Sequence, residues 1–290
     1  MDPVTRAALE SFRFDPWIVA ALLATGLVYL RGWRALHAQM PSRFTAARLA
    51  AFLAGLAALL AAVASPLDAF APFLLTVHMV QHLLITMVAA PLLLLGAPQM
   101  PLLRGLPAGF TRGALGPFLA APELRALGRW LTHPVPCLAA FVATTWLWHA
   151  PALYERALRA EGWHALEHAS FLGAALLFWW PVILPWPSVA RWPRWTVIPY
   201  LVIADLANTA LSALLSFAES VLYPTYAAAP RLAGTTALGD QSAAGALMWL
   251  TSSLCYLAPA GAIAIRLLSP PLARPGAAPD EARRDAHAAA

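Results

Sequence analysis

The stretch that decides the fold is His78-Met79-Val80-Gln81-His82, followed by the apolar run Leu83-Leu84-Ile85-Thr86-Met87-Val88-Ala89-Ala90-Pro91-Leu92-Leu93-Leu94-Leu95-Gly96. Together they are long enough to cross a bilayer as a helix. Residues four apart on a helix lie on one face, about 6 Å apart along its axis. Ionisable side chains are costly inside a membrane, so a histidine pair at this position indicates a functional site.

Composition assigns the whole chain to the membrane class. Of its 290 residues, 60% are hydrophobic and 11% are charged, and the mean hydropathy is +0.65. Runs of about 20 apolar residues mark membrane helices. Seven such spans are predicted, at 15–31, 46–64, 72–95, 134–150, 163–184, 197–217 and 242–265. We expect an all-α, polytopic membrane protein with one seven-helix domain over residues 1–268 and a disordered cytoplasmic tail over 269–290.

The arginines predict how the chain is oriented. It has no lysine, so all nineteen basic residues are arginine, and a retinal protein, which needs a Schiff-base lysine, is excluded. Basic residues concentrate in cytoplasmic loops. With the N-terminus outside and the C-terminus cytoplasmic, fourteen arginines fall inside and five outside, so we predict that orientation. The net charge of +5 comes from these loops and indicates no nucleic-acid partner.

Two segments are predicted to contact the lipid surface. The longest inner loop, 97–133, mixes apolar residues with four arginines, which is typical of short helices lying in the membrane interface. Tryptophans cluster from Trp179 to Trp195, which is typical of an interfacial aromatic belt.

Five of the eight histidines are predicted to converge on the outer side of the membrane. His78 and His82 lie in the outer half of the third span, and His149 ends the fourth. His164 and His168 repeat the spacing of four in the fifth. Imidazole is a common ligand of zinc, copper and haem iron, so the pattern predicts a transition-metal or haem site. The alternative is that each histidine only bonds a neighbouring helix.

Other polar and soft side chains accompany the histidines. Glu167 precedes His168, and Asp240 and Gln241 open the seventh span at the same level; such groups orient imidazole ligands from behind. Met248, in the outer half of that span, is a further candidate ligand, because thioethers favour Cu(I). A stripe along one face of the sixth span indicates either helix packing or a proton or ion path. Its members are Asp205, Asn208, Ser212, Ser216 and Glu219.

Two other kinds of site fit parts of this pattern. His82 and His168 on antiparallel helices could hold a single haem as a bis-histidine pair. His164-Ala-Leu-Glu167-His168 also reads as the inverted zinc-protease signature H-x-x-E-H, with the glutamate as general base. That reading requires a further carboxylate ligand and an open water position, so an intramembrane metallohydrolase is the weaker alternative.

Four short blocks, in order, resemble the CtaG family of bacterial cytochrome c oxidase assembly factors. They are His78-Met-Val-Gln81-His82 with Ala90-Pro91-Leu92 and Gly96-Ala-Pro98; Trp146-Leu-Trp148-His149-Ala-Pro151; His164-x-x-Glu167-His168; and Asp240-Gln241-x-x-x-Gly245-x-x-Met248-Trp249. The resemblance covers residues from about 15 to 268. It implies a multi-pass, seven-helix protein of the bacterial plasma membrane that is needed to build active oxidase. It implies no catalytic residues, so we expect no enzyme, with oxidase subunits and the lipid bilayer as partners.

The ligand types and the family resemblance both indicate copper as the metal. The copper centres of a bacterial oxidase are reached from the outer side, and imidazole and thioether ligands there are able to release Cu(I). We therefore expect copper to bind at His78, His82, His149, His164, His168 and Met248. The sequence does not decide between two roles for this copper: delivery to the oxidase, or transport across the membrane along the polar stripe.

Overall fold

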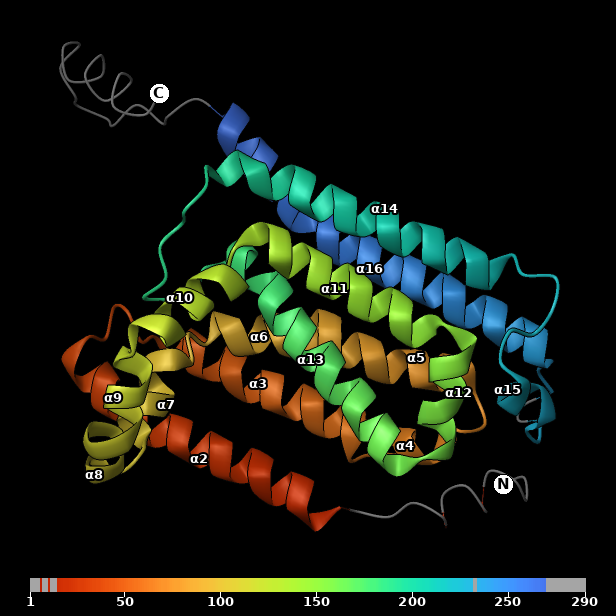
Figure 1. Cartoon of the computed structure of the whole chain (residues 1–290), viewed down its shortest axis with the longest axis horizontal. Coiled ribbons are helices and arrows are strands. Elements are labelled where there is room, and N and C mark those ends of the chain that lie inside the picture. The colour runs from red at the N-terminus through yellow and green to blue at the C-terminus, as the bar shows by residue number, and fades with distance from the viewer. Residues whose placement is uncertain (1–5, 7–9, 11–14, 232–233, 270–290) are drawn as a thin grey trace.

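The computed structural model describes residues 6, 10, 15–231 and 234–269, and over these described residues it contains helices and no strand (Figure 1). The predicted tail lies, except for Ser269, outside the described residues. Six helical stretches are long and apolar enough to cross a membrane. They are Pro16–Gln39 (α2), Ala46–Phe70 (α3 Ala46–Val63 with α4 Pro66–Phe70), Leu75–Leu95, Glu161–Ile183 (α13), Arg194–Ser216 and Ala237–Leu268 (α16). The chain is thus an all-helical membrane protein.

The predicted fourth span, 134–150, is a helix at nearly these bounds, but it is too short to count among the six. Its helix, α11, runs over Pro134–His149 and has 16 residues, so the structure gives six candidate spans where the sequence predicted seven. The helix ends because Ala150, which precedes Pro151, is extended with φ −64° and ψ 126°. A second short helix, α12 (Pro151–Arg159), follows directly.

The third span is interrupted in the middle. It consists of α5 (Leu75–Leu83), a π-helical segment η1 (Leu84–Ala89) and α6 (Ala90–Leu95). In a π-helix each N–H donates to the carbonyl five residues earlier, as the Ala90 N–H does to Ile85 O. The next such bond would run from Pro91 to Thr86 O. Proline has no N–H, and the indole of Trp179 donates to Thr86 O instead, at 2.9 Å. Trp179 is only 4% exposed, so it belongs to the core and the predicted interfacial belt was wrong for it.

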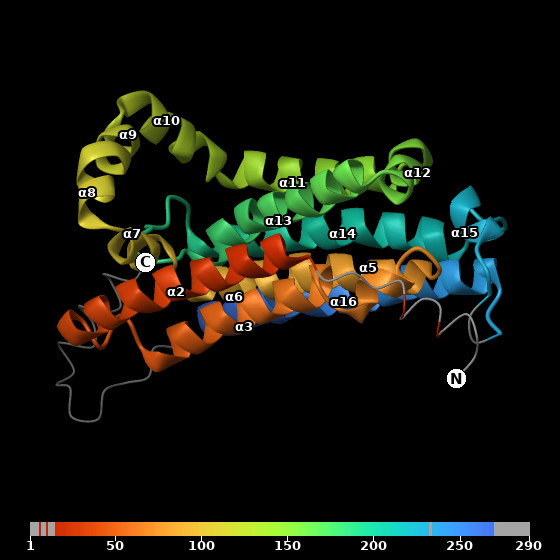
Figure 2. The same cartoon turned by 90° about the horizontal axis from the view of Figure 1, so that it is seen from below.

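The helices form an elongated bundle (Figures 1 and 2). α14 (Val197–Ser216) runs beside α16, α11 beside α13, and α3 beside α6. α2 packs against α7 (Gln99–Gly105), where Cβ atoms on Gly32 and Gly105 would lie 1.8 Å from the carbonyl oxygens of Pro101 and Val28. Only glycine permits that approach.

The two ends of the bundle differ. One end holds α12, the short α15 (Pro224–Ala228) and the start of α5. The other holds the short helices α7, α8 (Ala108–Phe110), η2 (Thr111–Leu115), α9 (Gly116–Ala120) and α10 (Pro122–Leu131), as Figure 2 shows. The loop 97–133 thus contains the short helices that the sequence predicted, and their place at the membrane interface stays a prediction.

Candidate metal centre

A buried cluster of imidazoles and one carboxylate lies between α5 and α13. The Nε2 atoms of His78 and His82 are 2.9 Å apart. Glu167 of α13 places its two carboxylate oxygens 3.6 Å from these nitrogens, one oxygen to each. His78 and Glu167 are fully buried and His82 is 4% exposed. Glu167 therefore faces the imidazoles directly, whereas the sequence placed it behind them.

The remaining predicted histidines surround this core. His78, His82 and His168 form one group whose ligand atoms lie within 4.8 Å of one another, and His78, His164 and Glu167 form a second. The ring of His149, at the end of α11, is 6.5 Å from the ring of His82. His164 and His168 are only partly buried, so the cluster opens toward the start of α13. The two groups share His78, which makes this residue the centre of the cluster.

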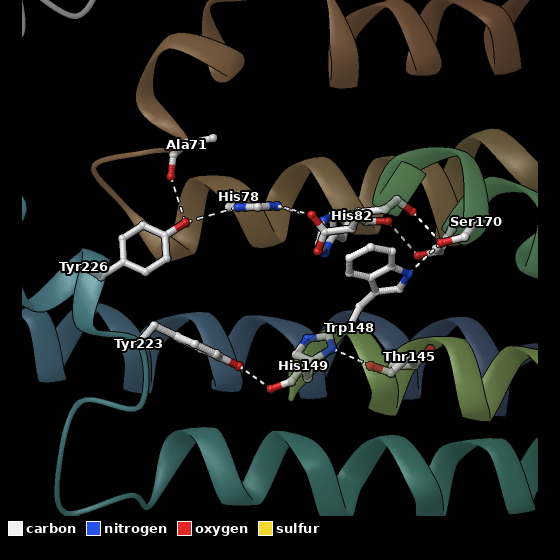
Figure 3. A network of polar contacts seen from close by, with 11 residues as sticks. Ala71, His78, His82, Thr145, Trp148, His149, Ser170, Tyr223 and Tyr226 are labelled. Atoms are coloured by element: carbon white, nitrogen blue, oxygen red, sulfur yellow. Dashed lines mark hydrogen bonds and ion pairs between the residues drawn. The ribbon is translucent and has the colours of Figure 1, made fainter. Parts of the chain in front are cut away.

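The tautomer of His78 follows from its hydrogen bonds. The Tyr226 hydroxyl donates to the carbonyl of Ala71 at 2.9 Å, so its oxygen is left to accept from His78 Nδ1 at 3.1 Å (Figure 3). Nδ1 therefore carries the proton. The lone pair of Nε2 points at His82 and Glu167, as metal coordination requires.

His149 has the same tautomer as His78. Its Nδ1 lies 2.7 Å from the carbonyl oxygen of Thr145, which can only accept, so Nδ1 carries the proton here too. Nε2 keeps its lone pair and has no hydrogen-bond partner among the described residues. A backbone carbonyl one helical turn back thus prepares this imidazole as a ligand.

Several buried polar atoms of the cluster lack a hydrogen-bond partner. Within the described part of the chain these are His82 Nδ1, His149 Nε2, His168 Nε2 and both carboxylate oxygens of Glu167. Buried polar atoms are normally satisfied, because an orphaned one costs about 1–3 kcal/mol. Three of these five atoms lie on predicted ligands and two on Glu167, which the sequence placed beside the metal site, and together they fit a bound cation.

Asp240 and Gln241 do not contact an imidazole. Asp240, at the start of α16, accepts from the backbone N–H groups of Leu75 and Thr76 at 2.6 and 3.2 Å and so caps α5. Gln241 accepts from the N–H of Leu222 at 2.8 Å and holds the segment that leads to Tyr226. Both residues support the cluster through the backbone, which differs from the direct contact that the sequence suggested.

Replacing Asp240 with alanine is expected to destabilise the protein by about 1–3 kcal/mol, because it leaves the first N–H groups of α5 without acceptors. Thermal unfolding in detergent measures the loss. Asp240→Asn, which keeps one acceptor oxygen, is expected to lose less. Equal stability of all three proteins would contradict the capping role.

A second contact fixes α15, which carries Tyr226. Glu155 of α12 accepts from the Thr225 N–H at 3.0 Å and from its hydroxyl at 2.7 Å. Burial raises the pKa of Glu155, but these bonds and Arg159 outweigh it and hold the pKa below its usual range. Burial raises the pKa of Tyr226 above its usual value, so this phenol stays neutral and keeps its proton for Ala71.

Met248 and the polar stripe lie apart from these contacts. Met248 is 3% exposed and packs in the hydrophobic core; its role as a ligand stays a prediction. The stripe bonds within α14 and to α16: Ser253 donates to Asp205 at 2.6 Å, and Asn208 donates to Ser212 at 3.4 Å. Glu219 is exposed beyond the end of α14.

The fold and the site together define a polytopic membrane protein with a buried histidine–carboxylate cluster at one end of its helix bundle. Residues 27–269 match the family model described as cytochrome c oxidase caa3 assembly factor (Caa3_CtaG). The chain belongs to this family of oxidase assembly factors.

Curated relatives come from mycobacteria and are described as uncharacterised. One from Mycobacterium bovis is 27% identical over 264 residues, which is 87% of this chain and 38% of the relative. One from Mycobacterium leprae is 26% identical over 254 residues, covering 84% and 37% respectively. The chain thus spans less than two fifths of the length of these relatives. No solved structure matches the chain.

Proposed function

We propose that this protein binds a copper ion at the histidine cluster and assists formation of the metal centre of cytochrome c oxidase in the bacterial plasma membrane. In this proposal α11 serves as a seventh span despite its length, the N-terminus is outside and the C-terminus is cytoplasmic. The cluster then faces outward, the side from which oxidase copper centres are reached. The chain acts as an assembly factor and carries out no catalysis.

The unpartnered cluster atoms are the observation that carries this proposal. The unpartnered Nε2 atoms of His149 and His168 and a buried carboxylate without a hydrogen-bond donor form a ligand set for a transition-metal ion. Imidazole suits zinc, copper and iron alike, so the choice of copper rests on the family's link to an oxidase.

The arrangement also supports release of the ion. Five imidazoles and one carboxylate exceed the needs of a four-coordinate ion. Because the two ligand groups share His78, an ion can exchange His82 and His168 for His164 and Glu167 without leaving the protein. His164, on the more exposed side, is the natural point of transfer to a partner subunit.

The alternatives fit the contacts less well. The rings of His82 and His168 are 5.3 Å apart, and Phe171 packs 4.5 Å from His82, so a flat macrocycle has little room between them. A metallohydrolase needs Glu167 directed at a water on an ion held by His164 and His168, yet the carboxylate faces His78 and His82. A copper path along α14 competes with the hydrogen bonds of the stripe to α16.

Oxidase activity in cells tests the function. In a strain lacking the chain, the double variant His82→Asn/His168→Asn is expected to restore less than about a tenth of the activity, since it removes two ligands of one group. Excess copper in the medium is expected to recover part of it. His133→Asn is the matched control, because His133 lies at the other end of α11, where it caps the helix and packs against Trp192, and asparagine can keep the cap. Full activity of the double variant would contradict the proposal.

A further inference from the structure

A cavity of about 720 Å³ lies at the end of the bundle opposite the histidine cluster. Its walls include Pro134 at the start of α11, Leu184 just after α13 and Val197 at the start of α14. His149 ends α11, and His164 lies in the first turn of α13, so the cavity and the cluster occupy opposite ends of the same helices. In Figure 1 the cavity end is the one that holds α10.

Four arginines line the cavity, and none of its described lining residues is acidic. Arg125 and Arg129 come from α10, and Arg191 and Arg194 come from the segment between α13 and α14. Arg191 donates to the carbonyl of Arg129 at 2.7 Å, and Arg194 donates to that of Val182 at 3.1 Å. Carbonyl oxygens leave the positive charges unneutralised. In the described part of the chain, the arginine paired with a carboxylate is Arg159, at the other end of the bundle.

Apart from Thr132, Ser188 and Thr196, the rest of the wall is apolar, and it lies at the end of the bundle where α13 ends and α11 and α14 begin. Trp180, Leu184, Val189 and Trp192 line it, and the tryptophans are residues that favour the membrane–water interface. α10 carries Trp130, which is 61% exposed, so this helix has an apolar surface available to lipid. The cavity thus joins a cationic side to an apolar side at a membrane boundary.

We propose that this cavity binds the headgroup of an anionic phospholipid, with the arginines on its phosphate and the tryptophan side against its glycerol and upper acyl chains. Guanidinium groups suit phosphate because they donate two parallel hydrogen bonds. Basic pockets between membrane helices favour anionic lipids of the cytoplasmic leaflet, and the arginine distribution predicts that this end is cytoplasmic. The proposal is independent of any metal at the histidine cluster.

Native mass spectrometry of the full chain in detergent with equal phosphatidylglycerol and phosphatidylcholine tests it. The wild type is expected to retain phosphatidylglycerol, and Arg125→Gln/Arg129→Gln to lose about tenfold or more of that preference, at roughly 1 kcal/mol per charge. These two arginines are chosen because Arg191 and Arg194 also donate hydrogen bonds to backbone carbonyls, so replacing them would disturb the local structure as well as the charge. Arg34→Gln/Arg266→Gln, which removes two exposed charges from residues that do not line the cavity, is expected to keep the preference.

Three results of these comparisons would overturn the proposal, and a lysine variant supplies a fourth. They are equal retention of both lipids by the wild type, unchanged preference in Arg125→Gln/Arg129→Gln, and displacement of the lipid by millimolar inorganic phosphate alone. Arg125→Lys/Arg129→Lys is the control for misfolding. It keeps both positive charges, so it is expected to retain more phosphatidylglycerol than the glutamine variant. If both double variants lose the lipid equally, the charge does not hold it and the proposal fails.

Discussion

Replacing Glu167 with glutamine is expected to weaken metal binding by about 10- to 100-fold and, at the same time, to stabilise the metal-free protein by roughly 1–3 kcal/mol. The carboxylate is fully buried, and both its oxygens lack a hydrogen-bond donor among the described residues. Without a bound cation this buried charge lowers the free energy of unfolding. When a cation is bound, the carboxylate neutralises part of the cation's charge. A purely structural glutamate would shift both quantities in the same direction.

Metal titration and thermal unfolding of metal-free protein measure the two effects. Glu161→Gln is the matched control, because Glu161 lies on the same helix but is exposed. It is expected to change neither quantity. Loss of stability in metal-free Glu167→Gln would contradict a site built for a cation. Unchanged metal affinity with lost function would instead support the hydrolase alternative.

Replacing Tyr226 with phenylalanine is expected to lower metal affinity by about 10- to 100-fold, since it removes the group that sets the His78 tautomer. The change deletes one oxygen and leaves the ring to pack as before. Without it, Nδ1 of His78 loses its acceptor, and either nitrogen can carry the proton. His78 belongs to both ligand groups, so the whole cluster is affected.

Tyr223→Phe provides the control for this prediction. The Tyr223 hydroxyl donates to the backbone carbonyl of His149 at 3.0 Å and does not contact an imidazole (Figure 3). Its loss is expected to cost stability and leave metal affinity within about threefold, because the His149 tautomer is set by Thr145. Equal affinities for the two variants would refute the assigned role of Tyr226.

The histidines could be found from the sequence because helical spacing places positions i and i+4 on one face. Arginine counting then predicted that His149, His164 and His168 lie at the level of His78 and His82, and in the structure ring distances of 4.2–6.5 Å connect all five. The supporting residues were not predictable in this way. Tyr226 and His78 are 148 positions apart, and no periodicity links a loop tyrosine to a helix face.

Asp240 illustrates the same limit. The sequence placed it at the level of the histidines as a support for an imidazole, yet its partner is the backbone N–H of Leu75, which sequence patterns do not reveal. The break in the third span was also missed. Pro91 signals an interruption, but the indole of Trp179 that satisfies the freed carbonyl comes from 93 positions away.

The metal content of purified protein tests the central claim most directly. Elemental analysis is made on the wild type and on a variant with His78, His82, His164 and His168 all changed to alanine, both loaded with copper and dialysed. We predict about one copper per chain in the wild type and none above background in the variant, because the variant removes most of the ligand set. Equal copper in the two proteins, or none in either, would contradict the account.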